Sequence, residues 1–227
     1  MAWDDWIRTV EIEPSLYAAD FASLGAQVDA LLHGEARVFH WDVGDGHFVE
    51  PITMGPVVMR WISERVHALG GVLDVHLMVD QPQKHFRQFA EAGADSVTFH
   101  FEAVDDAEAT ARAARELGLQ AGLAVNPSTK VEDVAAPAMA AQVDLVLCMS
   151  VHPGYSGQEF LPGSLDRLRW LRAALPRTMH LQVDGGITHE NVRDAHEAGA
   201  DLLVAASAIF GYEDLPRSYR RLVQALA

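Results

Sequence analysis

The sequence of 227 residues contains a single cysteine, Cys148, within an apolar segment. One thiol cannot form a disulfide within the chain, so we expect it to be buried and inert, and we expect a cytoplasmic location. Long apolar runs are also absent, since no stretch approaches the roughly 18 apolar residues of a membrane span. Residues 1–6 do not combine a basic region with an apolar run, so we expect neither a signal peptide nor a membrane partner.

Basic residues are few and scattered: 17 Lys and Arg stand against 32 Asp and Glu, a net charge of −15. Because phosphate backbones are held mainly by clustered Lys and Arg, a nucleic-acid partner is excluded. An anionic small molecule remains compatible with this charge, because backbone amides at a helix N-terminus bind phosphate without basic side chains. No linker rich in Pro, Gly or Ser divides the chain, so we expect one domain over residues 1–227.

Short β-rich runs alternate with longer segments of helical period along the whole sequence, as in βα units around a parallel sheet. We predict eight strands, at residues 10–15, 37–42, 73–78, 96–100, 120–125, 145–149, 180–183 and 202–205. The predicted helices are residues 20–32, 56–69, 83–92, 105–117, 131–136, 164–174, 190–198 and 215–226. This order predicts an α/β fold, the (β/α)₈ TIM barrel.

An internal repeat favours closure of this barrel. The sequence Glu-Ala-Gly-Ala-Asp occurs at residues 91–95, before the fourth predicted strand, and again at residues 197–201, before the eighth. Each copy is typical of a helix end with Gly at its C-cap, followed by a turn into a strand. A doubly wound sheet can contain similar turns, so this alternative stays open.

Four residues at predicted strand ends form a candidate metal site. In a TIM barrel the chemistry lies at the carboxyl ends of the strands, where this chain has His40, Asp42, His76 and Asp184. Two imidazoles and two carboxylates suit one divalent zinc, iron, cobalt or manganese ion. A lone His at a strand end is more often a hydrogen-bonded core residue, but the four residues together favour a metal site.

Asp42 and Asp184 are also the candidate catalytic pair. They come from strands far apart around the ring, so they can approach a substrate from opposite faces. If one takes a proton from a carbon beside a carbonyl and the other returns a proton to the opposite face, the centre is inverted through a metal-stabilised enediolate. The alternative is that both merely cap loops. We expect Asp45, His47 and His100 to lie in loops or to support the ligands from behind.

Two segments after the last predicted strands indicate a phosphate site. Residues 184–188 follow the seventh strand and residues 206–211 follow the eighth, where barrel enzymes often bind phosphate with backbone N–H groups. The long, Gly-rich loop of residues 150–158 suits a flap over the ligand. Met78 and Met149 are expected to wall the site against water, although Met is more often core filler.

Several motifs together resemble a known family, the ribulose-phosphate 3-epimerases. These motifs are Pro14-Ser15-Leu16, the run from His40 to Val49, Asp74-Val75-His76-Leu77-Met78, the run from Met149 to Gly154, Val183-Asp184-Gly185-Gly186-Ile187, and the run from Ser207 to Phe210. The resemblance covers essentially the whole chain. It implies a ribulose-phosphate-binding type of barrel, an isomerase of the pentose phosphate pathway, that interconverts D-ribulose 5-phosphate and D-xylulose 5-phosphate with one divalent metal ion per chain.

The resemblance also implies roles for individual residues. His40, Asp42, His76 and Asp184 match the family's metal ligands, and Asp42 and Asp184 match its acid/base pair. The predicted substrate- and phosphate-binding residues are Ser15, Met78, His152, Gly154, Gly157, Gly185, Gly186, Ala206 and Ser207. We expect a phosphorylated ketose as partner and a homo-oligomer as the assembly.

Four departures from the family pattern bear on the substrate. Gly44 stands where the family usually has a Met of the site wall, Tyr17 where it has a Leu, His152 where it usually has an Asn, and Ala206 where it has a Gly. A related sugar phosphate such as D-allulose 6-phosphate, or a phosphosugar-binding barrel without catalysis, therefore stays open. A decarboxylase of the orotidine-phosphate type is disfavoured, because the segment from Asp42 to Asp45 lacks that superfamily's Lys.

Overall fold

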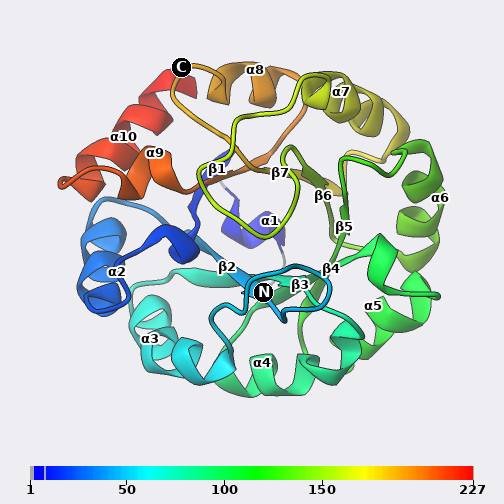
Figure 1. The fold of residues 1–227 in the computed structure, drawn as a ribbon, viewed down its shortest axis with the longest axis horizontal. Helices are drawn as coiled ribbons and strands as arrows, with labels where there is room; N and C mark the ends of the chain where they lie inside the picture. Colours follow the sequence, from blue (N-terminus) through cyan, green and yellow to red (C-terminus); the bar gives the residue numbers. More distant parts are fainter. Residues whose placement is uncertain (1–2, 8, 227) are drawn as a thin grey trace.

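Eight parallel strands form the centre of the computed structural model, which describes residues 3–7 and 9–226. The sheet order is β1-β8-β7-β6-β5-β4-β3-β2, and an isolated bridge between Ser15 and His40 brings β1 against β2 to complete the ring (Figure 1). The strands are β1 (Glu11–Pro14), β2 (Val38–Gly44), β3 (Val72–Met78), β4 (Ser96–His100), β5 (Gln120–Val125), β6 (Leu145–Met149), β7 (His180–Asp184) and β8 (Leu202–Ala205). The structure is therefore the predicted barrel.

Helices surround this barrel as an outer ring (Figure 1). They are α2 (Leu24–His33), α3 (Pro56–Ala68), α4 (Phe86–Ala92), α5 (Ala107–Arg115), α6 (Glu132–Ala141), α7 (Ser164–Ala174), α8 (Val192–Glu197), α9 (Ser207–Phe210) and α10 (Leu215–Leu226). Among the described residues, no helix is long and apolar enough to cross a membrane.

Alternation along the strands divides the core into two parts. In β2, Phe39, Trp41 and Val43 belong to the large apolar cluster between strands and helices, whereas Val38 belongs to a smaller cluster inside the barrel. Because side chains alternate across a strand, His40 and Asp42 share the inward side with Val38. The barrel interior is thus apolar at its amino end and polar toward its carboxyl end.

A short helix that the sequence pattern did not predict covers the amino end of the barrel. Helix α1 (Trp3–Trp6) buries both of its tryptophans, whose ring centroids lie 4.7 Å apart in an edge-to-face arrangement. The two rings belong to the cluster inside the barrel, with Val38 and Leu145. Figure 1 shows α1 behind the strands, within the ring. Helix α1 therefore acts as a plug.

Helix ends differ from the predicted ones more than strand ends do. Helix α2 begins at Leu24 rather than residue 20, because residues 16–18 form a separate 3₁₀ turn and Asp20 accepts a hydrogen bond from the Ala22 N–H. Helix α6 continues to Ala141 rather than ending at residue 136, although Pro137 lies inside it. Burial of Ala138 and Ala141 against the barrel outweighs the hydrogen bond that Pro137 cannot donate.

Candidate active site

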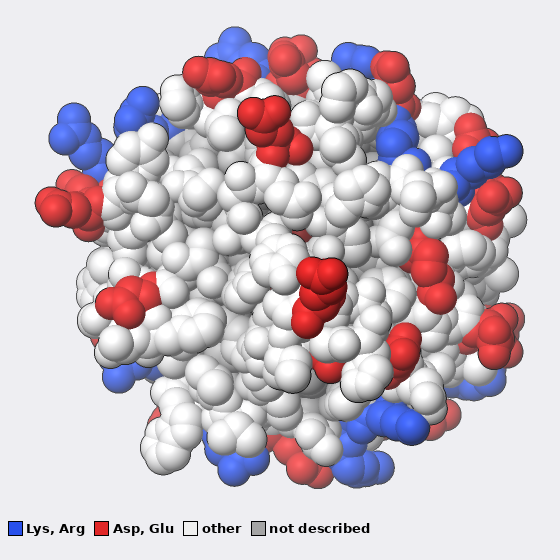
Figure 2. Space-filling view, in the orientation of Figure 1, with Lys and Arg blue, Asp and Glu red and all other residues white. Residues whose placement is uncertain are grey.

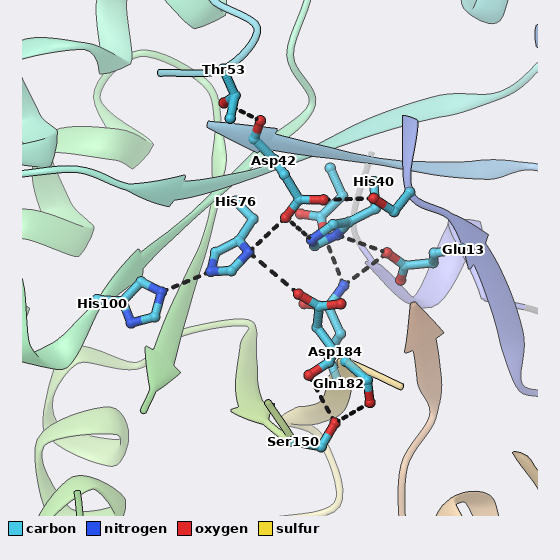
Figure 3. Close-up of polar contacts among 12 residues, drawn as sticks. Glu13, His40, Asp42, Thr53, His76, His100, Ser150, Gln182 and Asp184 are labelled. Atoms are coloured by element: carbon cyan, nitrogen blue, oxygen red, sulfur yellow. Dashed lines mark hydrogen bonds and ion pairs between the residues drawn. The ribbon is translucent and has the colours of Figure 1, made fainter. Parts of the chain in front are cut away.

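His40, Asp42, His76 and Asp184 converge at the carboxyl end of the barrel (Figure 3). The register of β2 and β3 places Asp42 directly opposite His76, and Nδ1 of His76 lies 3.0 Å from Oδ1 of Asp42. Nε2 of His40 lies 3.3 Å from the same oxygen, and Nδ1 of His76 lies 3.8 Å from Oδ2 of Asp184. One ligand atom from each residue lies within 4.8 Å of the others, so the four could hold a single ion.

The donor set fits a divalent metal ion. Nε2 of His40 is fully buried and has no hydrogen-bond partner among the described residues, although it faces the other three groups. A buried nitrogen without a partner is costly, and a bound cation would satisfy it. Two imidazoles and two carboxylates suit zinc, iron, cobalt or manganese.

A second polar group lies beneath His40, and the sequence analysis missed it. Nδ1 of His40 lies 3.1 Å from Oδ2 of Asp74 and 3.4 Å from Oε2 of Glu13. The side-chain amide of Gln182 donates to both of these carboxylates at 2.8 Å, and the Ser96 hydroxyl donates to Asp74 at 2.5 Å. The signal for Asp74 and Gln182 was their position two residues before the predicted ligands His76 and Asp184, which places them on the same inward face of β3 and β7. This network holds the His40 ring and fixes which nitrogen faces the ligand cluster.

The surroundings drive the pKa values of the two candidate catalytic carboxyls apart. Burial and, to a smaller extent, the charge of Asp42 together raise the pKa of Asp184 to about 7. Burial opposes ionisation of Asp42 as well, but the nearby charge of His40 and the hydrogen bond with His76 hold its pKa well below the usual range. In the absence of metal, Asp42 is therefore ionised at neutral pH, whereas Asp184 keeps its proton to a much higher pH than an ordinary aspartate does.

The buried groups around His40 also carry shifted pKa values. Burial raises the pKa of Glu13 to about 8, against the opposing hydrogen bond to His40. Burial lowers the pKa of His40, but the neighbouring carboxylates outweigh it, led by Asp42, and the net direction is upward. Burial lowers the pKa of His100, behind His76, to about 4. Glu13 and His40 therefore keep a proton to a higher pH than usual, whereas His100 loses its proton at a lower pH than usual.

A pocket opens beside the two catalytic candidates. Asp42 and Asp184 line it, and the Ser15 hydroxyl, also in the lining, donates to Oδ2 of Asp42 at 2.6 Å. Both predicted wall residues, Met78 and Met149, are in the lining. The other lining residues that the sequence analysis singled out are Tyr17, Gly154, Gly157, Gly185, Gly186, Ala206 and Ser207.

One predicted binding residue lies elsewhere. His152 is exposed and is not part of the pocket lining, and its carbonyl accepts a hydrogen bond from the side chain of Gln158. The segment around it, residues 150–158, has no helix or strand and crosses in front of the barrel (Figure 1), as expected for a flap. Gln158 therefore gives this loop internal hydrogen bonds, while Gly154 and Gly157 provide its pocket-facing backbone.

Gly185 and Gly186 follow β7 with φ values of 117° and 66°, in the region that favours glycine. A Cβ atom on Gly186 would lie 2.4 Å from the backbone nitrogen of Phe160, and one on Gly185 would lie 2.4 Å from the side chain of Val151. The Ser150 hydroxyl donates to the carbonyl of Gly185 at 2.6 Å. Close packing with the flap loop therefore demands both glycines, apart from any role in binding phosphate.

Two departures from the family pattern have a structural explanation. Ala206 has a φ of −103°, so its methyl group carries no left-handed strain. A Cβ atom on Gly44 would lie 2.6 Å from the carbonyl oxygen of Pro51 and 2.8 Å from the side chain of Val49. The loop after β2 fills the space in front of Gly44, so the absence of a Met there does not open the wall.

Among the residues that the structure describes, no Lys or Arg lines the pocket. Figure 2 shows the same face of the molecule with its basic side chains at the rim and acidic ones nearer the centre. An anionic group bound here would therefore rely on backbone N–H groups. The glycine-rich turn after β7 and the start of α9 carry such groups in the pocket lining.

The fold and this site define a TIM-barrel enzyme with paired carboxyl groups and a candidate metal site at the carboxyl ends of its strands. Comparison of sequences sharpens this class. The sequence model described as the ribulose-phosphate 3 epimerase family matches residues 11–210, so the chain belongs to this family and is an epimerase of the isomerase class. Helix α1 lies outside the matched residues.

Curated relatives cover nearly the whole chain. Ribulose-phosphate 3-epimerase 2 of Cupriavidus necator is 39% identical over 226 residues, which is 96% of this chain and 92% of that protein. Ribulose-phosphate 3-epimerase of Escherichia coli K12 is 40% identical over 206 residues, which is 89% of this chain and 90% of that protein. The family resemblance expected from the motifs is confirmed.

Solved structures share the fold at lower identity. The 3-hexulose-6-phosphate synthase from Salmonella typhimurium superposes with a TM-score of 0.72 at 17% identity, covering 95% of this chain and 98% of that chain. Orotidine 5'-phosphate decarboxylase from Pyrococcus horikoshii superposes with a TM-score of 0.71 at 16% identity, with the same coverage. These likenesses show the barrel fold alone.

Proposed function

We propose that the chain epimerises carbon 3 of D-ribulose 5-phosphate to give D-xylulose 5-phosphate, by two-base proton transfer. The observation that carries the proposal is the pair Asp42 and Asp184, which line one pocket from β2 and β7. Their pKa shifts in the metal-free chain have opposite directions, so the surroundings already distinguish the two carboxyls, and inversion needs one ionised base and one protonated acid at the start.

In this mechanism each carboxyl group serves one face of the substrate. The ionised carboxylate takes the proton from carbon 3, and the protonated carboxyl of the other residue delivers a proton to the opposite face. In the reverse reaction the two residues exchange roles. The hydrogen bond from the Ser15 hydroxyl holds the Asp42 carboxylate toward the pocket, and the flap loop with Met78 and Met149 limits the access of water.

His40, Asp42, His76 and Asp184 would hold a divalent ion. When bound, this ion supplies Lewis-acid stabilisation of the negative charge that develops on the substrate oxygens. The residues beneath His40, Asp74 and Glu13, keep its ring oriented toward the ligand cluster. We expect zinc, iron, cobalt or manganese, and not a hard ion such as magnesium, because two of the ligands are imidazoles.

The phosphate group is assigned to the backbone of Gly185, Gly186 and Ser207. All three residues line the pocket beside Asp184. The two glycines have positive φ values, which residues with a Cβ atom rarely adopt. Such a backbone conformation can direct successive N–H groups at one bound anion. D-Allulose 6-phosphate, with one more carbon, is the alternative substrate, and a barrel that binds phosphosugars without catalysis is the alternative function.

Deuterium exchange tests the reaction directly. Metal-loaded protein is incubated with ribulose 5-phosphate or allulose 6-phosphate in deuterated water, and NMR measures deuterium at carbon 3. Uptake into ribulose 5-phosphate supports the proposal, and uptake into allulose 6-phosphate alone assigns the alternative substrate. Uptake into neither contradicts the epimerase and leaves a binding function.

Substitution of the two carboxyl groups tests their roles. Asp42→Asn and Asp184→Asn should each lower kcat by about 10²- to 10⁴-fold with the fold intact, which is the typical contribution of general acid or base catalysis. Asp166→Asn, on the exposed face of α7, is the matched control and should keep full activity. Near-normal turnover by either site variant removes that residue from the pair. The cytoplasmic location and the homo-oligomer stay predictions.

A further inference from the structure

His100, at the end of β4, lies directly behind His76 (Figure 3). The Nε2 atoms of the two imidazoles are 2.8 Å apart, and both side chains are fully buried. Nδ1 of His100 lies 3.4 Å from Oε2 of Glu102. The Phe48 ring covers His100 with its centroid 4.8 Å away, which limits rotation of the imidazole. A continuous polar chain therefore runs from the ligand cluster to Glu102.

This chain constrains where the protons are. A contact of 2.8 Å between two imidazole nitrogens requires that one donates and the other accepts. In one arrangement His76 donates from Nε2, which leaves its Nδ1 lone pair directed at the ligand cluster. In the other arrangement His100 donates, and His76 then carries its proton on Nδ1. Only the first arrangement allows Nδ1 of His76 to bind a metal ion.

Glu102 selects between the two arrangements. An ionised carboxylate only accepts hydrogen bonds, and burial of Glu102 is outweighed by hydrogen bonds that hold its pKa at about 2. Its Oε1 already accepts from the Asn126 N–H at 2.9 Å, which leaves Oε2 facing Nδ1 of His100. Glu102 thus favours the His100 proton on Nδ1. The ionised Asp42 carboxylate, 3.0 Å from Nδ1 of His76, favours the opposite arrangement in the metal-free chain, and a cation bound between Asp42 and His76 removes that preference. Nε2 of His100 then accepts, and Nε2 of His76 must donate.

We propose that His100 and Glu102 are positioning residues that fix the tautomer and orientation of His76 for divalent-metal binding. The inference rests on the metal site of the proposed function. In many metal sites a carboxylate accepts a hydrogen bond from the nitrogen of a ligating imidazole that does not bind the metal. Here one additional imidazole, that of His100, lies between the ligand His76 and the carboxylate of Glu102. Neither residue lines the substrate pocket, so both act through His76.

Glu102→Gln is the decisive variant, because it keeps the shape and removes the charge. Its amide oxygen can accept either from Asn126 or from His100, but not from both at their present positions, since the amide NH₂ then faces the other donor. His100→Leu removes the acceptor altogether, and His100→Gln restores an oxygen that can accept from His76. His67→Leu is the control, because His67 is an exposed imidazole 2.9 Å from Asp95, away from the site.

Co²⁺ titration of chelator-treated protein, followed by visible absorption, measures metal affinity without any substrate. Glu102→Gln and His100→Leu should weaken Co²⁺ binding by about 10- to 100-fold. His100→Gln should regain most of the affinity, and His67→Leu should match the wild type. The ¹⁵N spectrum of the zinc-loaded wild type should show the protons on Nε2 of His76 and Nδ1 of His100.

The outcomes separate this inference from the proposed function. Wild-type Co²⁺ affinity in Glu102→Gln, or a His100 proton on Nε2 in the zinc-loaded protein, overturns the inference and leaves the epimerase proposal standing. If the variants bind Co²⁺ more weakly but the wild type shows no deuterium exchange, the inference is supported and the epimerase proposal is overturned. A wild-type chain that binds no Co²⁺ overturns both the inference and the metal requirement. If His100→Leu fails to fold, Glu102→Gln, altered outside the core, decides.

Discussion

Asp184 holds its proton more tightly in the folded chain than an unfolded aspartate does, with a pKa of about 7 against the ordinary value of 3.8. Between these two values the folded state binds more protons than the unfolded state. The free energy of unfolding contributed by Asp184 therefore falls as pH rises from about 4 to 7. The contribution is largest below this window and is lost above it.

Asp184→Asn should remove this pH dependence. In metal-free protein with a chelator present, the difference in stability between wild type and variant should shift toward the variant as pH rises from 4.5 to 8. Urea denaturation at each pH measures it, and taking the difference cancels the titration of Glu13 and His40. Parallel stability curves would show that Asp184 titrates normally in the folded chain.

Gly44 yields a second prediction about a single residue. Because its Cβ position is blocked by the Pro51 carbonyl oxygen at 2.6 Å, Gly44→Ala should lower the free energy of unfolding by about 1–3 kcal/mol, as overpacking does. A Cβ atom on Gly55 would have no neighbouring atom of the described residues within 4 Å, so Gly55→Ala is the matched control. Thermal unfolding compares the two variants, and equal melting temperatures would mean that the loop after β2 moves to accommodate the added methyl group without a loss of stability.

The sequence predicts the candidate ligands at the strand ends, but it does not predict the polar residues that lie deeper in the barrel. His40, Asp42, His76 and Asp184 follow from one geometric rule about barrel strands. Glu13, Asp74 and Gln182 contact one another only because β1, β3 and β7 face one axis, which requires the closed ring and its register. The tautomer chain through His100 depends on atomic distances that no spacing in the sequence encodes.

At the scale of elements, helix α1 offers the clearest test of packing. Trp6 is 4% exposed within the plug, whereas Trp61 on α3 is 81% exposed. Trp6→Ala should lower the free energy of unfolding by about 3–5 kcal/mol, as large-to-small core substitutions do. Trp61→Ala should change it by no more than about 0.5 kcal/mol. Urea denaturation measures both, and equal effects would mean that the plug contributes little.

The strands were predictable where the helix ends were not. Apolar runs bounded by polar turns mark most of the strands, because strands that are buried on both faces are rich in apolar residues, and β1 (Glu-Ile-Glu-Pro) is the exception. Helix α1 has four residues, fewer than periodicity can detect, and only its packing against the barrel reveals it. The passage of α6 through Pro137 likewise reflects tertiary burial that local propensity does not contain.

At the scale of the whole molecule, the charge of −15 opposes an anionic substrate. Within residues 3–7 and 9–226, no Lys or Arg lines the pocket to offset this repulsion. Screening it should raise kcat/KM for a sugar phosphate by about twofold or more as salt increases from 10 to 150 mM. Steady-state kinetics in two different salts measure the effect and separate screening from competition by one anion. A decrease in both salts would indicate a positive local potential at the pocket.

The ring is joined least extensively where β1 meets β2. Seven neighbouring strand pairs share ladders of several residues, whereas an isolated bridge between Ser15 and His40 joins these two strands. Ser15 also donates to Asp42, so the same few atoms close the barrel and complete the site. A fluctuation that separates β1 from β2 would therefore remove the hydrogen bond that holds the Asp42 carboxylate before the rest of the chain loosens. Amide exchange along β1 should consequently report on the readiness of the enzyme as well as on its fold.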